Sequence, residues 1–287
     1  MPLPSTGDRW VIVTGAGTGI GRGIAVRLLR DGYRCVLAGP VESHLEDTVS
    51  EAAVPRDRAR ITATDIRKAD ERKALFTDLH PLYGLVNNAG VAFSSPLLDE
   101  QESDWHDTFA TNVIATQLLS LTAIEHMRES GSGRIVNVAS IRGMRAMNNA
   151  DYGAWSPKVT PGGRGPTRMT AYATSKAAII QLSKDLAAAA GEWNITVNSI
   201  SPGLVRHQHY DERALHEERA SLGRDPHRQG LGQPLQPETT SVLEQRIPLR
   251  RVGSVADIAG PVSFLLSDDA AYISGANLVV DGGWTVW

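Results

Sequence analysis

Tyr172 and Lys176 place a phenol and an ammonium group four positions apart in residues 171–190, a segment whose sequence predicts a helix throughout. Residues at this spacing lie on the same helix face, so the ammonium can approach the phenolic oxygen. A free tyrosine has a pKa near ~10 and is a poor base at neutral pH, but a nearby cation stabilises the phenolate and lowers that pKa. The pair is therefore a candidate proton-transfer device, although the same spacing also occurs on ordinary helix surfaces.

A glycine-rich run, residues 14–21, stands between an apolar stretch and a helical pattern. It reads Thr-Gly-Ala-Gly-Thr-Gly-Ile-Gly and follows the apolar residues 10–13. Glycines let a backbone approach a pyrophosphate closely, and a helix N-terminus offers free N–H groups and a positive dipole end. A turn that uses glycine only for its positive φ is the simpler alternative. The strand–loop–helix context favours a nucleotide-binding loop.

Two periodic patterns alternate along the chain and predict its fold class. Short apolar runs predict buried strands at residues 10–13, 35–38, 61–64, 85–86, 134–138, 195–200 and 278–280. Helical patterns lie between them at residues 20–31, 42–53, 68–79, 100–129, 171–190 and 254–266. This alternation is typical of a parallel sheet covered on both faces. We therefore expect an α/β protein in which residues 1–287 form one Rossmann-like, doubly wound domain.

Two longer segments interrupt the alternation. Residues 141–170 are rich in glycine and have no clear period, and residues 204–246 are rich in charged residues and histidine. Both follow the carboxyl end of a predicted strand, which is where open α/β sheets bind their ligands. Long irregular insertions in a compact domain are usually functional or disordered. We expect these two to lie near the substrate site.

The composition narrows the classes of function. The chain has 287 residues, 41% of them hydrophobic, and a formal net charge of −3. Near-neutral charge argues against a nucleic-acid partner, and no apolar run is long enough to span a membrane. The N-terminus lacks the basic start and apolar run of a signal peptide. The single cysteine, Cys35, lies in an apolar run and is expected to be buried. These features are typical of a cytoplasmic protein without a metal site.

An ordered set of motifs carries a family resemblance over almost the whole chain. The set comprises the glycine-rich run, Asp65, Asn87-Asn88-Ala89-Gly90, Asn112, Ser140, Tyr172 with Lys176, Pro202-Gly203 and Asp281-Gly282-Gly283. Each motif alone is modest, but their order is specific. The chain resembles a classical short-chain dehydrogenase/reductase, a family that transfers hydride to or from a nicotinamide cofactor.

The resemblance implies roles for four catalytic residues. Tyr172 would give or take the hydroxyl proton, and Lys176 would lower its pKa and hold the nicotinamide ribose. Ser140 would hydrogen-bond the substrate oxygen and stabilise its developing charge. Asn112 would hold a water that links Lys176 to solvent. Asp281-Gly282-Gly283 would be structural.

The resemblance also implies a cofactor site. Asp65 would accept a hydrogen bond from the adenine, Asn88 to Gly90 would lie beside the adenosine ribose, and the Val205 N–H would hold the nicotinamide carboxamide. The full set of expected cofactor-binding residues is Gly15, Gly17, Thr18, Gly19, Ile20, Gly21, Gly39, Asp65, Ile66, Asn88, Ala89, Gly90, Tyr172, Lys176, Pro202, Gly203 and Val205.

The chain departs from the family pattern near the catalytic residues. Between Ser140 and Tyr172 it has about twenty residues more than the family's usual dozen or so. Tyr152 stands at the usual distance from Ser140, but Ser156 follows it where the family has a lysine. Tyr172 is therefore the better candidate. His207 takes the position of a hydroxyl residue that usually contacts the nicotinamide.

The end of the second predicted strand bears on the choice of cofactor. The family's NAD users commonly carry Asp at the position of Gly39, and its NADP users commonly carry Arg at the position of Pro40. Here Glu42 and Glu46 follow, with no nearby Lys or Arg in the sequence. A dianionic phosphate beside these carboxylates would be poorly compensated, which favours NAD over NADP. A preference for NADP would require Arg9 or Arg22 to reach the phosphate.

We therefore predict an NAD(P)-dependent oxidoreductase that interconverts a secondary alcohol and a ketone. The alternatives are a non-redox nucleotide-binding protein and an isomerase or dehydratase on the same fold, because a fold alone does not fix a function. Arginines near Ser140, among them Arg142 and Arg145, leave recognition of a polar or anionic substrate as likely as a merely solvated loop. The family commonly forms tetramers or dimers. Apolar candidates for such contacts are Trp105, Phe109, Val113 and Trp284 to Trp287.

Overall fold

The computed structural model describes residues 9–146, 163–206, 217, 220–222 and 237–286. Tyr152, Ser156, His207 and Trp287 lie outside these ranges, so the predictions that involve them are not addressed. None of the helices in the described ranges is long and apolar enough to cross a membrane.

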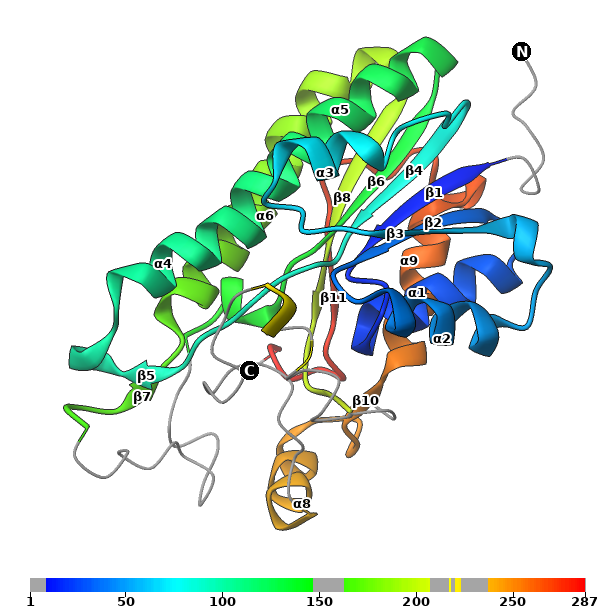
Figure 1. The fold of residues 1–287 in the computed structure, drawn as a ribbon. Coiled ribbons are helices and arrows are strands. Elements are labelled where there is room, and N and C mark those ends of the chain that lie inside the picture. Colours follow the sequence, from blue (N-terminus) through cyan, green and yellow to red (C-terminus); the bar gives the residue numbers. More distant parts are fainter. Residues whose placement is uncertain (1–8, 147–162, 207–216, 218–219, 223–236, 287) are drawn as a thin grey trace.

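The described residues form a parallel sheet of seven strands (Figure 1). In spatial order the strands are β3 (Ala59–Ala63), β2 (Arg34–Gly39), β1 (Trp10–Thr14), β4 (Leu82–Asn87), β6 (Gly133–Val138), β8 (Ile195–Pro202) and β11 (Asn277–Val280). The chain moves outward from β1 first to β2 and β3, and then to β4 and the strands beyond it. The order thus reverses next to β1, and crevices for nucleotides form at such a switch point. The predicted doubly wound sheet is confirmed.

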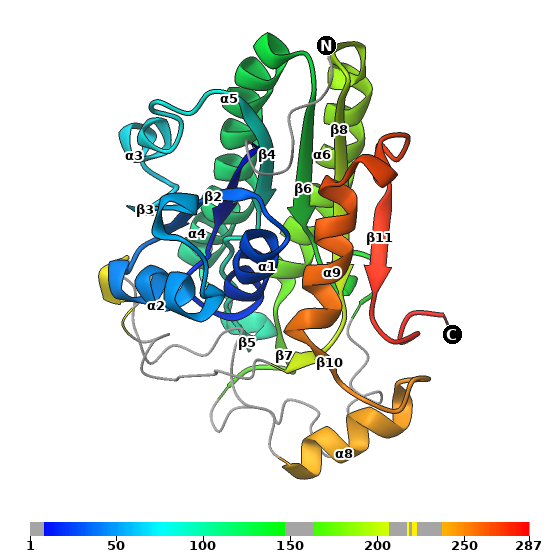
Figure 2. The ribbon, with the colours of Figure 1, turned by 90° about the vertical axis from the view of Figure 1, so that its right-hand side faces the viewer.

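Helices cover both faces of the sheet, as Figure 2 shows. One face carries α1 (Gly19–Arg30), α2 (Glu42–Ala52) and α9 (Val255–Leu266). The other face carries α3 (Ala69–Ala74), α4 (Glu102–Phe109), α5 (Ala115–Ser130) and α6 (Thr170–Ala190). The remaining helix, α8 (Pro237–Arg246), lies away from the sheet.

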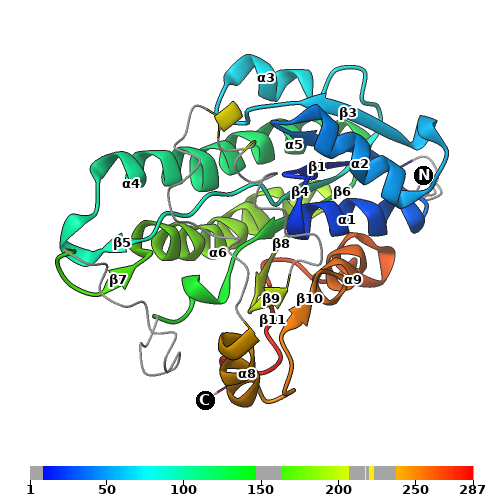
Figure 3. The same cartoon turned by 60° about the horizontal axis from the view of Figure 1, so that its bottom comes forward.

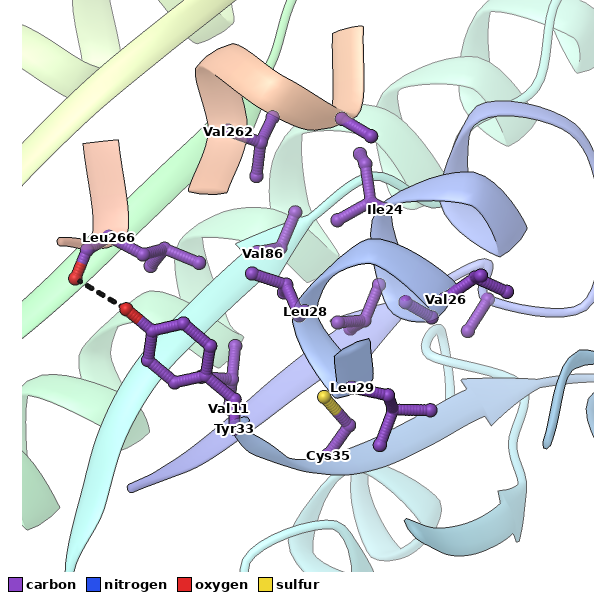
Figure 4. Packing of buried hydrophobic residues seen from close by; sticks show 14 of the residues in the cluster. Val11, Ile24, Val26, Leu28, Leu29, Tyr33, Cys35, Val86, Val262 and Leu266 are labelled. Atoms are coloured by element: carbon purple, nitrogen blue, oxygen red, sulfur yellow. Dashed lines mark hydrogen bonds between the residues drawn. The ribbon is translucent and has the colours of Figure 1, made fainter. Parts of the chain in front are cut away.

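The core consists of two apolar layers, one on each face of the sheet. Neighbouring residues of β1 alternate between them, so that Val11 and Val13 pack under α1 and α9 while Ile12 packs on the opposite side. Figure 4 shows the first layer, which contains Cys35. Burial raises the pKa of this thiol, as expected for an inert core cysteine. A strand buried on both faces needs apolar residues at consecutive positions, which explains the uninterrupted runs in the sequence.

Two predicted helices differ from the observed ones. The pattern at residues 100–129 is interrupted by one π-helical turn, Ala110–Ile114, between α4 and α5. The helix predicted at residues 68–79 is shorter in the structure, where α3 ends at Ala74. A helical periodicity does not distinguish between a continuous helix and one with a local change of winding, and such π-helical turns are frequent at functional sites.

Short strand pairs lie beyond the carboxyl ends of the main sheet (Figure 3). β5 (Ser95–Pro96) pairs antiparallel with β7 (Thr167–Arg168). β9 (Val205–Arg206) pairs parallel with β10 (Gly253–Ser254). The sequence did not predict these pairs, because two-residue strands carry no periodic signal.

Candidate active site

Ser140, Tyr172 and Lys176 lie together at the carboxyl end of β6. Ser140 follows that strand directly, and the other two lie on the buried side of the first turns of α6. All three side chains are buried. The Ser140 hydroxyl acts on the buried Tyr172 phenol and tends to lower its pKa. The long insertion between these two residues therefore does not separate them in space.

Lys176 interacts with the backbone of β6. Its Nζ donates to the Val138 carbonyl at 2.7 Å and lies 5.6 Å from the centre of the Tyr172 ring. Burial lowers the pKa of Lys176 to about 8, because the charged form loses its hydration. The ammonium therefore lies over the Tyr172 ring while it binds a carbonyl of β6.

The pKa of Tyr172 is shifted in the direction opposite to the sequence expectation. Burial raises this pKa, while the Ser140 hydroxyl and the charge of Arg142 act to lower it. Burial has the larger effect, because desolvation destabilises the phenolate more than Ser140 and Arg142 stabilise it. The net direction is therefore opposite to the expected one because of burial, and the effect assigned to Lys176 stays a prediction. Arg142, two residues beyond Ser140, is a cation whose charge acts on the phenol.

Asn112 connects three segments of the site from the π-helical turn. Its Oδ1 accepts from the Val91 N–H at 2.8 Å, and its Nδ2 donates to the Val91 carbonyl at 2.9 Å and to Ser175 Oγ at 3.0 Å. Ser175 directly precedes Lys176 in α6. A Cβ placed on Gly90 would lie 3.3 Å from Asn112 Oδ1 and 3.5 Å from Lys176 Nζ, so this glycine permits a close approach.

The start of α6 is held by residues of the 95–105 segment. Glu100 accepts hydrogen bonds from the Thr170 hydroxyl and, at 3.1 Å, from the Trp105 indole N–H. Thr170 is the first residue of α6 and stands two positions before Tyr172. One carboxylate thus connects the beginning of α4 to the beginning of the helix that carries the phenol. Sequence reasoning missed Glu100, because its partner Thr170 is 70 positions away.

Both ends of the first insertion are anchored. At its beginning, a Cβ on Gly143 would lie 2.5 Å from the Lys176 carbonyl carbon, so the turn after Ser140 packs directly on α6. At its end, the β5–β7 pair is extended by Arg164, whose Nε lies 2.6 Å from Asp99 Oδ1. The residues that flank Ser140 and Tyr172 are therefore fixed by contacts outside the insertion itself.

The glycine-rich loop has the geometry of an anion cradle. Gly15 and Gly19 have φ values of 64° and 53°, in the left-handed region that favours glycine. A Cβ on Gly21 would lie 2.0 Å from the Gly15 carbonyl oxygen. Within the described residues, no side chain caps the start of α1 at Thr18, and the first turn carries no acidic residue. The N-terminal N–H groups of α1 therefore suit a pyrophosphate, and these residues fit a nicotinamide dinucleotide.

The segment after β4 braces this loop. Thr14 Oγ1 accepts from the N–H groups of Asn88 at 3.0 Å and Ala89 at 3.1 Å. The Asn88 side chain donates to the carbonyls of Thr14 and Gly15 at 3.0 and 3.3 Å. The predicted pair of cofactor segments, residues 14–21 and 88–90, is therefore in direct contact.

Asp65 lies where the ends of β2 and β3 meet, since the Thr64 N–H donates to the Gly39 carbonyl at 2.8 Å. Its carboxylate is bound by Arg67, with Nε 3.0 Å from Oδ1 and Nη2 2.8 Å from Oδ2. Burial would raise the pKa of Asp65, but the hydrogen bonds and charge of Arg67 outweigh it and lower that pKa. Sequence reasoning did not single out Arg67, although a carboxylate and a guanidinium two positions apart were visible. The next residue, Ile66, is buried.

The two arginines considered for a cofactor phosphate lie at different ends of the sheet. Arg9 precedes β1 at its amino end, where it forms an ion pair with Asp268 at 3.0 Å, far from the strands' carboxyl ends. Arg22, in the first turns of α1, donates to the carbonyls of Gly17 at 2.8 Å and His44 at 3.3 Å. Arg9 is therefore excluded as a phosphate ligand, and Arg22 is next to the loop.

The remaining predicted segment, Pro202 to Val205, leaves the sheet beside the last strand. A Cβ on Gly203 would lie 2.7 Å from the Asp281 Cα, and the Gly203 N–H donates to the Val280 carbonyl at 2.9 Å. Asp281 in turn accepts from the Gly283 N–H at 2.8 Å and from the Thr285 hydroxyl at 2.7 Å. These contacts agree with a structural role for Asp281.

Comparisons with known proteins identify the family. A family model described as short chain dehydrogenase matches residues 9–155 and 159–218, and one described as enoyl-(acyl carrier protein) reductase matches residues 226–285. The 2-(S)-hydroxypropyl-CoM dehydrogenase 3 of Xanthobacter autotrophicus is 32% identical over 279 residues, covering 96% of each chain.

Solved structures agree with this assignment. Levodione reductase superposes with a TM-score of 0.76 at 26% identity, covering 98% of this chain and 99% of its own. A putative 2-deoxy-D-gluconate 3-dehydrogenase from Agrobacterium tumefaciens, solved with bound NADP, gives a TM-score of 0.74 at 28% identity and covers 97% of both chains. The chain therefore belongs to the classical short-chain dehydrogenase/reductase family and is an NAD(P)-dependent oxidoreductase.

Proposed function

We propose that the protein interconverts a secondary alcohol and a ketone, with Tyr172 as the proton acceptor and donor. The observation that supports this proposal is the burial of Ser140, Tyr172 and Lys176 together at the carboxyl end of β6, although they come from separate elements. A proton relay of this kind has no use in a protein that only binds a nucleotide. A nicotinamide bound along the glycine-rich loop would supply or accept the hydride.

The side chains divide the remaining chemistry between them. In alcohol oxidation, the Tyr172 phenolate takes the hydroxyl proton while Ser140 donates a hydrogen bond to the substrate oxygen. In ketone reduction, the Tyr172 phenol returns that proton. Lys176 uses one N–H for the Val138 carbonyl, and its other donors remain for the ribose hydroxyls that the family resemblance assigns to it. Asn112 holds the preceding residue, Ser175, and so helps to set the position of Lys176.

The cofactor proposed is NAD rather than NADP. The Gly39-Pro40 sequence offers no basic side chain, and α2 begins with the carboxylate of Glu42. The basic group nearest to the loop, Arg22, already binds two backbone carbonyls and lies 3.7 Å from Asp47. A 2′-phosphate would therefore have to compete for a guanidinium that is partly neutralised. Comparing kcat/KM for NAD and NADP tests this preference.

For the substrate we propose a polar or anionic molecule. Arg142 follows Ser140 closely enough for its charge to act on Tyr172, so a substrate held at these hydroxyls lies within the field of a cation. Arg145 is exposed on the same turn. The similar proteins are named for hydroxypropyl-CoM and for a deoxygluconate, both of which differ from a plain alkyl alcohol.

We also propose a cytoplasmic homo-oligomer, a tetramer or a dimer. The single buried thiol of Cys35 suits a reducing compartment. Of the apolar residues suggested by the sequence, Trp105, Phe109 and Val113 are partly buried and Trp284 packs in the core. Better candidates for contact are Ile114, Leu118 and Leu121, which are exposed on successive turns from the end of the π-helical turn into α5. Light scattering that shows a monomer at micromolar concentration would contradict assembly.

One experiment separates the redox enzyme from the alternatives. Sugars, hydroxy acids and cyclic alcohols are screened with both cofactors, and the absorbance of the reduced nicotinamide is followed. A secondary-alcohol dehydrogenase gives a stoichiometric net change in absorbance as substrate is consumed. Product formation without a net change would indicate an isomerase or dehydratase. Cofactor binding without any turnover over a broad screen would favour a non-redox binding protein.

A further inference from the structure

The described part of the second insertion contacts residues on two sides of the expected adenosine site. Glu217 Oε2 lies 3.3 Å from His44 Nε2. Five residues later, the Leu222 carbonyl accepts a hydrogen bond from Arg67 Nη2 at 3.0 Å. Figure 2 shows this short segment in yellow next to α2. The two contacts therefore fix residues 217 and 222 to elements that are distant in the sequence.

His44 and Arg67 flank the ends of two neighbouring strands. His44 is in the first turn of α2, just beyond the end of β2, and Arg67 follows Asp65 at the end of β3. In doubly wound sheets the adenosine half of a dinucleotide lies beyond these strand ends. Arg22 links His44 to the glycine-rich loop, because its guanidinium donates to both the Gly17 and the His44 carbonyls. The two contacts of the insertion therefore lie on either side of the expected adenosine site.

Arg67 holds several groups at once. Its guanidinium binds both oxygens of Asp65, lies 3.5 Å from Asp107 of α4, and donates to Leu222. The side chain is mostly shielded from solvent, with 24% exposed. A planar guanidinium with five donors is suited to hold several acceptors in fixed positions. Losing Arg67 would release Leu222 and remove the partner of Asp65, the carboxylate expected to contact the adenine.

From these contacts we propose that Glu217 and residues 220–222 form the outer wall of the adenosine pocket, with Arg67 as the positioning residue that holds Leu222. The wall covers the adenosine half of the cofactor and leaves the hydride-transferring half to the catalytic residues. It therefore controls the affinity and the release of the cofactor rather than the chemical step. This role holds for either nicotinamide cofactor, because both share the adenosine.

The proposal is tested by calorimetric titration with fragments of the cofactor. ADP-ribose and its 2′-phosphate are used as probes, and the better ligand of the wild-type protein is then measured with each variant. We expect Arg67→Ala to raise its Kd about tenfold or more, and Glu217→Gln to raise it several-fold, which are typical losses for charge-assisted hydrogen bonds. With NAD(P) and substrate, KM for the cofactor rises while kcat stays the same or increases.

A matched control uses a second histidine–glutamate pair. His106 Nε2 and Glu102 Oε1 are also 3.3 Å apart, but this pair is exposed on α4. Glu102→Gln should therefore leave the Kd of the fragment unchanged. If Arg67→Ala and Glu217→Gln also bind the fragment like the wild type, the segment is not part of the pocket and the proposal is wrong.

A second measurement needs no substitution and therefore does not depend on the folding of Arg67→Ala. Amide hydrogen exchange is recorded for the wild-type protein alone, with the adenosine fragment, and with nicotinamide mononucleotide. The fragment should slow exchange at residues 217 and 220–222 at least several-fold, whereas the mononucleotide at saturation should not. Equal exchange at these residues with and without the adenosine fragment would overturn the proposal.

Discussion

Two tyrosines stand beside cations at opposite ends of the sheet, and we propose a role in proton transfer for one of them, Tyr172. Tyr83, in β4 near the amino ends of the strands, has the Arg9 guanidinium 4.3 Å and the Arg134 guanidinium 5.7 Å from its ring centre. Tyr172, near the carboxyl ends, has the Lys176 ammonium 5.6 Å from its ring centre. Judged by nearby cations alone, Tyr83 would be the better acid.

The groups at the phenolic oxygens explain the difference. The Tyr83 hydroxyl donates to the Leu266 carbonyl at 2.8 Å, a bond that only the neutral phenol can form. Burial raises the pKa of Tyr83 to about 12, even though both arginines act to lower it. Near Tyr172 the corresponding group is the Ser140 hydroxyl, which acts to lower its pKa, and a hydroxyl can donate to a phenolate. The partner at the oxygen therefore decides the role of the phenol, more than a cation over the ring.

The largest expected effect comes from removing each hydroxyl in turn. Tyr172→Phe should lower kcat at least about 10²-fold, because it removes the transferable proton, while cofactor binding survives. Tyr83→Phe is the matched control, and it should leave kcat within about twofold and lower the free energy of unfolding by about 1 kcal/mol. Steady-state kinetics and urea unfolding provide the measurements. An active Tyr172→Phe together with an inactive Tyr152→Phe would move the role to Tyr152.

Replacing the partner at the oxygen tests the explanation directly. Ser140→Ala should lower kcat about 10- to 10²-fold, since one donor to the substrate oxygen is lost. It should also move the pH profile. Alcohol oxidation requires deprotonated Tyr172, so its rate rises as the pH passes through the pKa of Tyr172. Ser140 lowers that pKa, and its removal should shift the midpoint to higher pH. A midpoint that stays in place would separate Ser140 from the ionisation of Tyr172.

Replacing Glu100 should have an intermediate effect, because Glu100 only helps to fix the position of α6. Glu100→Ala removes the acceptor shared by Trp105 and Thr170, so the first turn of α6 should become less well fixed. We expect kcat to fall about tenfold, because small displacements of a catalytic group are costly. Cofactor KM should change little. Trp105→Phe keeps the aromatic ring and loses only the indole donor, so it should reduce kcat less than Glu100→Ala does.

The smallest expected effect concerns how the free energy of unfolding depends on pH because of Lys176. Its pKa is about 8 in the folded protein and near 10.5 when unfolded. Between these values the unfolded chain binds more protons, so the free energy of unfolding should rise with pH across this window. The expected gain is on the order of 1–3 kcal/mol, and it should be absent in Lys176→Met. Urea denaturation of both proteins at pH 7.5 and pH 10 (chosen as about the edges of the window) measures it.

The sequence predicted those features that depend on local patterns. Each predicted strand overlaps an observed one, because strands buried on both faces need consecutive apolar residues. The glycine-rich loop was also predicted from the sequence, because backbone geometry decides where such a loop needs glycine. The roles assigned to Asn112, Ser140, Tyr172 and Lys176 came from the family resemblance, and they remain predictions that the substitutions above test.

What the sequence did not predict are contacts between distant residues. Glu100 and Thr170 are joined across 70 positions, and Arg67 and Leu222 across 155. No periodicity encodes such pairs. The pKa of Tyr172 was misjudged for a similar reason, because the depth of burial and the partner at the oxygen are properties of the packed structure.

The anchoring of the first insertion has a consequence for how this enzyme can change over evolutionary time. Gly143 packs on α6 at one end, and the β5–β7 pair closes the other, so the chain between them forms a loop with fixed ends. The entropy of closing such a loop grows only logarithmically with its length, by about 0.6 kcal/mol for each doubling. Residues between the anchors can therefore be gained, lost or exchanged at little thermodynamic cost. Ser140 and Tyr172 can therefore keep their registration while the length of chain between them changes.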